Sequence, residues 1–426
     1  MAPSRMLLPG LFFIALIVLV ISGCGGGGGG GGGGDSRNLD EWEPVFRSYK
    51  AAGILDLDGD GAVDIVFTEF RVRAKTSCNY KAGDLACKTK TRDEYLLFVY
   101  LQDEMQPGSF LKGDKYILAS MAYSIASEDL DRDGIPDLVM PQTHDGTVRV
   151  LSQYMSGSGG FLSSADHATG NRPAGIAAGD LNGDGLPDIV VGGDDLVLLE
   201  NNQASPGKDF STRSLGIANV TAVAMADIDR DGRNDLVVTG GDSVTVLLQD
   251  PPPALPGNFS SQASYAAGKD SADVDIADLN NDSLPDLAVA NRGDNGGSVS
   301  LHMQDALNTG TFLQAVYYDA GLNSTAVVIG HLNNDFQPDL VVANDENDAG
   351  SVSVLMQDPG APGLFLDTDD YPGLDGPEDV AVADVSGDGV TDIVIADNYA
   401  LPKGSPYYRP QDTSNPGTFP DRVAIP

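Results

Sequence analysis

The 426-residue chain has little positive charge and few histidines. Its 25 Lys and Arg residues stand against 62 Asp and Glu residues, so the formal net charge at pH 7 is −37. Such a chain repels phosphate backbones and anionic membrane surfaces, which weighs against nucleic acid as a partner. The four histidines are scattered along the sequence, and no HExxH, GxSxG or P-loop motif accompanies them. We therefore expect a protein without catalytic activity.

What the chain does contain favours a folded all-β protein. Hydrophobic residues make up 41% of it, which is enough for a core, and only 20% of the residues are charged, so the acidity does not indicate disorder. The 52 glycines and 25 prolines indicate many turns. This composition is typical of short strands joined by tight turns.

The amino-terminal segment has the features of an export signal. The apolar stretch from Leu11 to Ile21 has the length of a signal-peptide core and is too short to span a membrane. Residues 21–24 read ISGC and resemble the lipobox of bacterial lipoproteins. This resemblance implies a signal peptide over residues 1–23 and lipidation of Cys24. An ordinary cleavage site beside an incidental cysteine is the alternative.

A linker follows the proposed lipidation site. Ten consecutive glycines, Gly25 to Gly34, predict a flexible tether within residues 24–41. Because Gly25 is not Asp, the resemblance to lipoproteins implies an exported protein that is anchored in the outer membrane, on its periplasmic or its cell-surface face.

One nine-residue pattern recurs seven times along the rest of the chain. The copies, numbered here loop 1 to loop 7, read DLDGDGAVD from Asp56, DLDRDGIPD from Asp129, DLNGDGLPD from Asp180, DIDRDGRND from Asp227, DLNNDSLPD from Asp278, HLNNDFQPD from His331 and DVSGDGVTD from Asp384. Their starts lie 73, 51, 47, 51, 53 and 53 residues apart, which matches one four-stranded propeller blade per copy. The sequence therefore predicts a seven-bladed β-propeller over residues 42–426.

The segments between the copies support this prediction. Apolar stretches flank each copy, and a further strand in each repeat opens on a phenylalanine that follows a Gly-rich turn. We interpret these phenylalanines as packing anchors between blades: Phe110, Phe161, Phe210, Phe259, Phe312, Phe365 and Phe419. Which strand closes the ring stays open, because Glu43 to Tyr49 could supply an outer strand beside the last blade.

The first repeat carries an insertion at about Arg71 to Glu94, between its second and third strands. It is rich in Lys and Arg and contains Cys78 and Cys87, which we expect to form a disulfide in an exported protein, with two free thiols as the alternative. A binding hairpin and a solvated decoration are both open interpretations of this insertion.

Positions 1, 3, 5 and 9 of the nine-residue pattern carry carboxylates that can converge on one cation, and the carbonyl of position 7 can add an oxygen. Calcium accepts six to eight such oxygen ligands, and position 6 is glycine in five copies because the chain turns sharply there. Turns of the Asx type that need no metal are the alternative.

Seven copies at this spacing, each followed by a strand and by the Phe-containing segment, resemble the FG-GAP or VCBS repeats, which also form the head propeller of integrin α subunits. The resemblance implies calcium sites in the hairpins between the first two strands of each blade. The ligands that it implies are Asp56, Asp58, Asp60 and Asp64 in loop 1, Asp129, Asp131, Asp133 and Asp137 in loop 2, Asp180, Asn182, Asp184 and Asp188 in loop 3, Asp227, Asp229, Asp231 and Asp235 in loop 4, Asp278, Asn280, Asp282 and Asp286 in loop 5, and Asp384, Ser386, Asp388 and Asp392 in loop 7.

Two loops depart from the pattern. In loop 5, Ser283 replaces the turn glycine, and calcium binding there stays open. In loop 6, His331 replaces the first Asp and Phe336 replaces the glycine, so we expect that loop to be metal-free. We therefore expect about five to six structural calcium ions.

These features favour a non-catalytic, surface-tethered propeller that binds a protein or glycan partner in an adhesion or recognition role, as a monomer. A hydrolase or lyase that acts on extracellular polysaccharide is one alternative, because 62 acidic residues could conceal a catalytic carboxylate pair. A scaffold for envelope assembly is another, and the fold alone does not choose among the three.

Overall fold

The computed structural model describes residues 43–58, 60–81, 84–103, 106–153, 160–170, 172–251, 257–293, 298–333, 335–346, 350–399, 406–420 and 422–425. The predicted signal peptide, Cys24 and the glycine linker lie outside these residues. The chain divides into two compact units, residues 1–41 with 76–88, and residues 42–75 with 89–426. The second unit contains the propeller.

The described residues form twenty-eight strands and no helix. The strands of blades 1 to 4 are, in order, β1 (Glu43–Leu55), β2 (Asp64–Lys81), β3 (Asp84–Gln102), β4 (Phe110–Leu118), β5 (Ala126–Glu128), β6 (Asp137–Gln142), β7 (Thr147–Gln153), β8 (Phe161–Ala168), β9 (Ile176–Gly179), β10 (Asp188–Val191), β11 (Val197–Asn201), β12 (Phe210–Ser214), β13 (Ala222–Ala226), β14 (Asp235–Gly240), β15 (Ser243–Leu248) and β16 (Ser261–Ala266). Those of blades 5 to 7 are β17 (Ser271–Ala277), β18 (Asp286–Asn291), β19 (Ser298–His302), β20 (Val316–Asp319), β21 (Ser324–Gly330), β22 (Asp339–Asn344), β23 (Gly350–Leu355), β24 (Asp369–Leu374), β25 (Pro377–Ala383), β26 (Asp392–Tyr399), β27 (Tyr407–Arg409) and β28 (Val423–Ala424).

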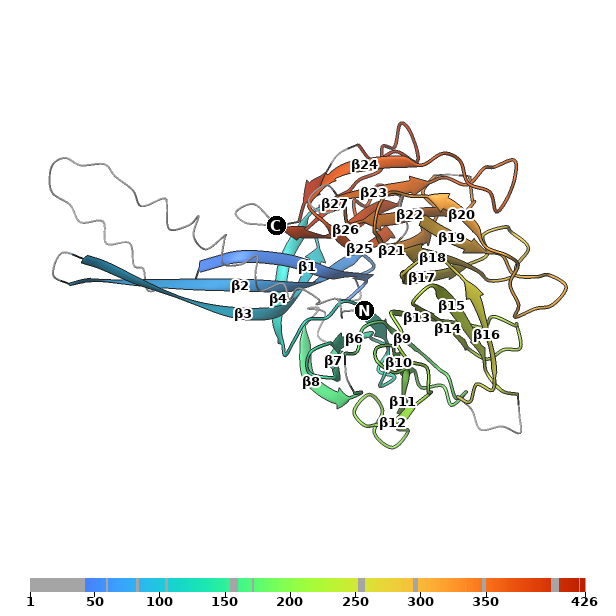
Figure 1. Ribbon diagram of the computed structural model, residues 1–426, viewed down its shortest axis with the longest axis horizontal. Helices are drawn as coiled ribbons and strands as arrows, with labels where there is room; N and C mark the ends of the chain where they lie inside the picture. Colours follow the sequence, from blue (N-terminus) through green and yellow to red (C-terminus); the bar gives the residue numbers. More distant parts are fainter. Residues whose placement is uncertain are drawn as a thin grey trace, which may run out of the picture. The chain divides into compact units, whose positions relative to one another are not determined.

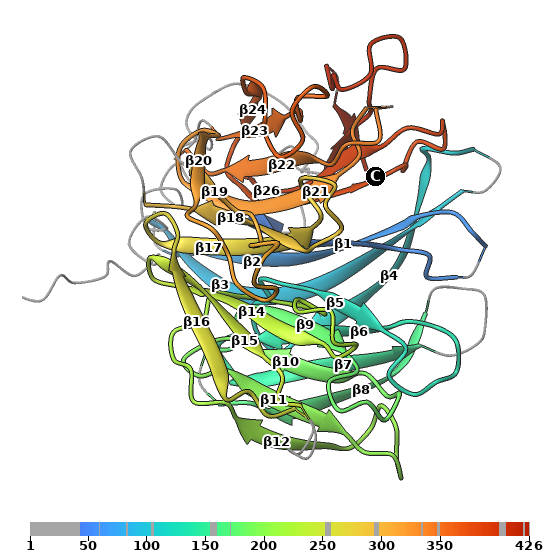
Figure 2. The same ribbon diagram turned by 90° about the vertical axis from the view of Figure 1, so that its right-hand side faces the viewer.

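Each blade is built from four consecutive strands that pair antiparallel with their neighbours in the chain. The first strands of adjacent blades contact one another around the centre, for example β13 with β17 and β21 with β25, and the fourth strands lie at the rim (Figure 1). The rim strand β16 faces the viewer in the second view (Figure 2). The seven-bladed propeller with four-stranded blades is therefore confirmed.

The ring closes between the first and last blades without exchanging a strand. The outer strand of blade 7 is β28, and Glu43 to Tyr49 belong to β1, the inner strand of blade 1, so the suggestion that this segment lies outside the last blade is wrong. Instead, Arg47 and Ser48 of β1 pair with Tyr399 and Asn398 of β26, which joins the two blades in one sheet.

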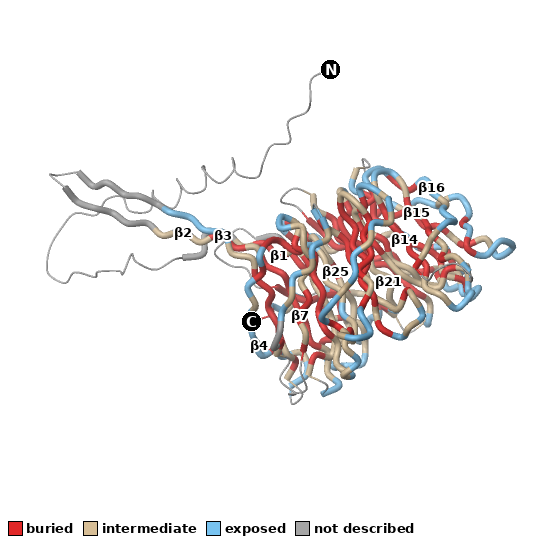
Figure 3. Tube along the Cα trace, turned by 90° about the horizontal axis from the view of Figure 1, so that it is seen from below, coloured by how far each residue is buried: buried red, intermediate tan, exposed pale blue. Residues whose placement is uncertain are grey.

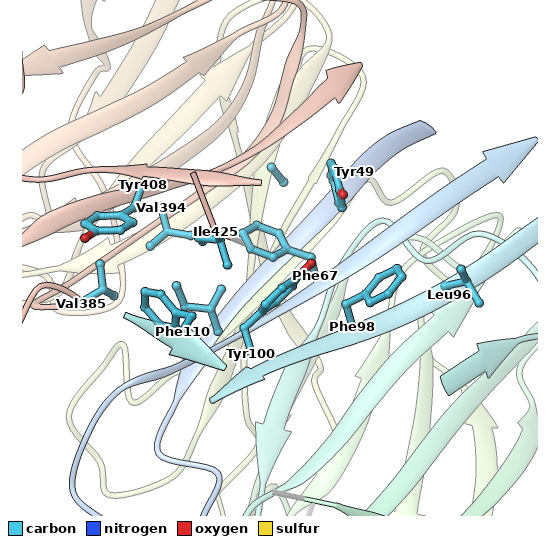
Figure 4. Packing of buried hydrophobic residues seen from close by; sticks show 12 residues of the cluster. Tyr49, Phe67, Leu96, Phe98, Tyr100, Phe110, Val385, Val394, Tyr408 and Ile425 are labelled. Carbon is cyan, nitrogen blue, oxygen red and sulfur yellow. The ribbon is translucent and has the colours of Figure 1, made fainter. Parts of the chain in front are cut away.

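An apolar cluster fills the boundary between these two blades. Phe67, Tyr100 and Phe110 of blade 1 pack in it with Val394 and Tyr408 of blade 7 (Figure 4). The rings of Phe110 and Tyr408 meet edge to face at a centroid distance of 6.1 Å. The closure therefore rests on burial of apolar surface as well as on strand pairing.

The second strands lie in the interior of the blades, and those of blades 2, 3, 5 and 6 are buried along their whole length. Every residue of β18 and of β22 is buried. The rim strand β16, in contrast, is mostly exposed (Figure 3). Neighbouring blades cover both faces of a second strand, which explains why its sequence is a continuous apolar run and not an alternating one.

The repeated phenylalanines pack between blades, as predicted. Phe312 of blade 5 meets Tyr265 of β16 in blade 4 edge to face at 5.5 Å, and its backbone N–H donates to the Tyr265 hydroxyl at 3.2 Å. The same ring contact joins Phe161 to Tyr116, Phe365 to Tyr318 and Phe419 to Tyr371. The tyrosines were not identified from the sequence, although they precede their phenylalanines by 45 to 48 residues.

Strands β2 and β3 of blade 1 continue into the stretch at about Arg71 to Glu94 where the sequence predicts an insertion. Arg71 is 5% exposed and donates to both carboxylate oxygens of Glu69 at 2.7 and 2.9 Å, so it is a buried member of an ion pair and not a solvated charge. Arg73 pairs with Glu94 at 2.9 Å. The side chains of Cys78 and Cys87 lie outside the described part of the structure, and their disulfide stays a prediction.

Candidate metal centres in the acidic loops

The seven acidic loops occupy the same place in every blade. Each begins directly after the first strand of its blade, and position 9 is the first residue of the second strand. The predicted location between the first two strands is therefore confirmed. Because the first strands all run in the same direction, the loops lie at one end of the ring.

The carboxylate at position 9 is buried and connects the loop to its own blade. In loop 4, Asp235 accepts the N–H of Ile228 at 2.9 Å and the N–H of Gln249, which follows the third strand, at 2.7 Å. The same pair of bonds, at 2.7 to 3.2 Å, is made by Asp64, Asp137, Asp188, Asp286, Asp339 and Asp392. Position 9 thus satisfies two backbone donors in every blade.

Loop 6 shows that this role does not depend on carboxylates at positions 1 and 3. Its position 1 is His331, yet Asp339 accepts the N–H groups of Leu332 and Gln357 at 3.0 and 2.9 Å. The position 9 carboxylate is therefore part of the fold, whether or not it also binds a metal ion.

The earlier positions bend the loop around its own carboxylates. In loop 4, Asp227 accepts the N–H groups of Asp231 and Gly232 at 2.9 and 3.0 Å, and Asp229 accepts that of Asp231 at 3.2 Å. Gly232 at position 6 has φ of 87°, in the left-handed region that glycine adopts at no steric cost. Phe336 occupies the same position in loop 6 with φ of 62° and is 87% exposed.

Three loops bring three carboxylates close enough together to hold one cation. Within each group the oxygens lie within 4.8 Å of one another, and among the residues that the structure places the groups are Asp56, Asp58 and Asp64; Asp129, Asp131 and Asp133; and Asp227, Asp229 and Asp235. These are loops 1, 2 and 4, the loops with Asp at position 3. Loops 3, 5 and 7 carry Asn182, Asn280 and Ser386 there.

The three groups have the donor chemistry that calcium requires. All donors are oxygens, and the loops add no His or Cys that would favour zinc. Burial, followed by a neighbouring carboxylate, raises the pKa of the position 3 residues Asp58, Asp131 and Asp229. A divalent cation would relieve both costs, since it replaces lost hydration and offsets the mutual repulsion.

Loop 6 does not offer this donor set. The Nδ1 atom of His331 lies 2.9 Å from the carbonyl oxygen of Gln337 at position 7. An imidazole thus contacts the backbone oxygen that the pattern assigns to a metal, and position 1 has no carboxylate. The expectation of a metal-free loop 6, like the count of five to six ions, stays a prediction.

Sequence reasoning missed a side-chain amide that crosses each blade boundary. Gln304, after the third strand of blade 5, donates from Nε2 to the carbonyl of Ile228, at position 2 of loop 4 in blade 4, at 3.1 Å. The equivalent donor and acceptor pairs are Gln102 and Val385, Gln153 and Leu57, Asn201 and Leu130, Gln249 and Leu181, Gln357 and Leu279, and Gln411 and Leu332. The repeated LQD and MQD phrases were its signal. Because Gln102 of blade 1 reaches Val385 of blade 7, the bonds run around the whole ring.

The four histidines have different surroundings in the described part of the structure. His167 packs on Phe210, and His331 lies in loop 6. His302 is fully buried on β19, neither ring nitrogen has a hydrogen-bond partner, and burial lowers its pKa to about 4. The His144 ring lies 6.5 Å from the Tyr95 ring, and His144, between β6 and β7, shares blade 2 with His167 on β8.

A family of repeats matches three segments of the chain. The FG-GAP-like repeat is found at residues 129–191, 227–289 and 278–342, and each match runs from position 1 of an acidic loop to the second strand of the next blade. The chain carries FG-GAP-like repeats. The resemblance to FG-GAP repeats is therefore confirmed, whereas the resemblance of residues 21–24 to a lipobox stays a prediction.

No curated protein matches the sequence of this chain with FG-GAP-like repeats. Solved structures with a similar fold do match it. A candidate 6-phosphogluconolactonase from Bacteroides fragilis aligns with a TM-score of 0.51 at 13% identity, over 78% of this chain and 85% of that chain. Sqt1 from Chaetomium thermophilum aligns with a TM-score of 0.48 at 14% identity, over 89% and 87%. At 13% identity the likeness to the first of these structures shows the fold alone.

The buried position 9 carboxylates predict how the stability of the metal-free propeller depends on pH. Burial raises their pKa from the ordinary 3.8 to about 6 in Asp64, Asp235, Asp339 and Asp392, and to about 7 in Asp137, Asp188 and Asp286. Because the folded pKa lies above the unfolded value, their contribution is complete below about pH 4 and is lost as the pH rises through 6 to 7. We expect the Tm in a chelator to fall between pH 5 and pH 8.

Surface repulsion in a chain of net charge −37 would act in the same direction, so salt provides the control. Thermal unfolding is followed at both pH values in low salt and in ~1 M NaCl, where the screening length is about 3 Å. Persistence of the fall in high salt supports the buried carboxylates as its cause. Loss of the pH dependence in high salt would contradict it.

Proposed function

We propose that this protein is a calcium-binding recognition propeller that is tethered to the cell surface and binds a protein or glycan partner without chemical turnover. The observation that carries the proposal is the gathering of three carboxylates in loops 1, 2 and 4 of a propeller with FG-GAP-like repeats. The fold is consistent with a recognition role. The calcium sites, the partner and the tether are proposals that go beyond the fold.

Calcium serves a structural purpose in this proposal. The loops with Asp at position 3 supply one more carboxylate than the loops with Asn or Ser, so loops 1, 2 and 4 bind calcium more tightly than loops 3, 5 and 7. A bound ion neutralises carboxylates that otherwise repel one another, and it therefore fixes the end of each blade at which the loop lies.

The opposite end of the ring is the better candidate for partner binding. The acidic loops all span nine residues, whereas the connections between second and third strands range from two residues, 241–242 in blade 4, to seven, 400–406 in blade 7. A rigid scaffold with loops of variable length at one end is a common arrangement for recognition. We therefore place the partner on the second-to-third-strand connections.

The proposed tether rests on the sequence. Residues 21–24 resemble a lipobox, and the following glycines supply a flexible linker between Cys24 and the propeller. The part of the chain that the structure describes contains no helix with the length and hydrophobicity of a membrane span.

Calorimetric titration of the full chain tests the calcium sites. We expect the chelator-stripped protein to bind calcium, and Asp229→Asn to lose the loop 4 site or weaken it at least tenfold, because a neutral ligand replaces a charged one. Asp335→Asn is the control, since it removes a carboxylate from loop 6, where position 1 is His331. No binding heat in the wild-type protein, together with no rise in Tm on adding calcium, would overturn the proposed sites.

A binding panel tests the recognition role. The full chain is screened against immobilised glycans and envelope proteins in calcium and in chelator, and we expect binding that calcium strengthens and that leaves the ligand chemically unchanged. Mass analysis of the glycans after incubation provides the decisive control. Cleaved polysaccharide would replace the proposal by a hydrolase or lyase, and stoichiometric capture of one assembly protein would favour the scaffold.

A further inference from the structure

The amides that cross the blade boundaries contact a specific part of each acidic loop. The Gln304 side chain is fully engaged: Nε2 donates to the carbonyls of Ile228 in loop 4 and of Pro285 in its own blade, and Oε1 accepts the N–H of Gly310 at 3.0 Å. The Ile228 carbonyl belongs to the peptide unit whose N–H is that of Asp229. The Gln304 side chain of blade 5 therefore hydrogen-bonds to the peptide group that links positions 2 and 3 of loop 4.

The other side of the same peptide unit is fixed from within blade 4. The N–H of Asp229 lies 3.3 Å from Oδ2 of Asp235, which also accepts the N–H of Ile228 at 2.9 Å. The peptide group before Asp229 therefore donates a hydrogen bond to a carboxylate of its own blade and accepts one from an amide of the next blade. Both contacts restrict the backbone dihedrals that aim the Asp229 carboxylate.

The turn after Gln304 closes on Asp229 itself. Gly310, two residues before the packing anchor Phe312, has φ of 82°, and a Cβ added to it would lie 3.2 Å from the Cβ of Asp229. In blade 3, a Cβ on Gly207 would lie 3.0 Å from the Cβ of Asp131 in loop 2. In blade 6, a Cβ on Gly363 would lie 3.1 Å from the Cβ of Asn280 in loop 5, so in blades 3, 5 and 6 the glycine lets the turn approach position 3 of the preceding loop.

We propose that the third-strand amide and the following turn of each blade are positioning elements for the calcium loop of the preceding blade, so that calcium affinity in loop 4 depends on Gln304 of blade 5. This inference rests on the proposed calcium binding. It deepens that proposal, because each metal site then belongs to two blades and calcium fastens one blade to the next.

The chain offers a matched pair of substitutions. Gln304 faces loop 4, which has the carboxylate group, whereas Gln411 makes the same contact with Leu332 of loop 6, which has His331 at position 1. Both amides also donate to the position 8 carbonyl of their own blade, Pro285 and Thr391. The pair therefore differs in the metal-binding residues of the neighbouring loop.

The test compares Gln304→Met with Gln411→Met in the full chain by calcium calorimetry and by thermal unfolding in chelator. We expect both variants to lower the metal-free Tm, because each leaves buried carbonyls without donors. We expect only Gln304→Met to weaken calcium binding, by about fivefold to tenfold at one site, and to add nothing in an Asp229→Asn background. Gln304→Asn should recover part of the affinity, since blade 3 uses Asn201 for the same contact at 2.8 Å.

The possible failures are distinguishable. Equal calcium isotherms for Gln304→Met, Gln411→Met and the wild type, with lowered Tm in both variants, would overturn the inference and leave the amides as structural bonds only. A wild-type protein that binds no calcium would overturn the proposed function itself. If Gln304→Met does not fold, the calcium affinity of Gln304→Asn is measured instead. A wild-type calcium affinity together with a lowered Tm in Gln304→Asn would contradict the positioning role.

Discussion

A buried carboxylate that accepts two backbone N–H groups is the interaction on which the rest of this propeller depends. In each blade it lies at the first residue of the second strand and joins the acidic loop to the end of the third strand. Removing such a carboxylate would leave two buried donors without acceptors, which costs about 1 to 3 kcal/mol for each group. The position 9 carboxylate of the acidic pattern therefore stabilises the fold whether or not a metal ion is bound.

The same interaction places the loops at the boundaries between blades. The residue whose N–H reaches the position 9 carboxylate also sends its side-chain amide to the loop of the preceding blade, so one Gln or Asn connects two loops. The ring of bonds closes at Gln102 and Val385, beside the aromatic cluster between the first and last blades. Apolar packing supplies most of the stabilisation, and the polar bonds set the register in which adjacent blades pack.

Much of the fold could be predicted because the repeat carries local information. The spacing of the acidic copies gave the number of blades, and their apolar flanks gave the strands around each loop. The pattern also distinguished loop 6, where His331 contacts the position 7 carbonyl that the pattern assigns to a metal. Local residue types determined these features, so no knowledge of distant contacts was needed.

The remaining features depend on which distant residues meet. Six of the seven amides donate to carbonyls 68 to 96 residues away in the sequence, and Gln102 donates to Val385, 283 residues away, so the amide residue alone does not reveal its acceptor. The position of β1 in blade 1, the burial of Arg71 against Glu69 and the unpaired imidazole of His302 likewise follow from tertiary packing. The structure was also needed to show that the position 9 carboxylate accepts two backbone N–H groups within its blade, since position 9 looks like positions 1 and 5 in the sequence.

The central claim is that calcium in an acidic loop fastens its blade to the next one. Hydrogen exchange of the full chain, with and without calcium, tests this most directly. The account predicts that calcium slows amide exchange in loop 4 and also in residues 305–312 of blade 5, whereas residues 412–418, beside loop 6, are unchanged. Slowing that is confined to the acidic loops, or equal in both turns, would contradict it.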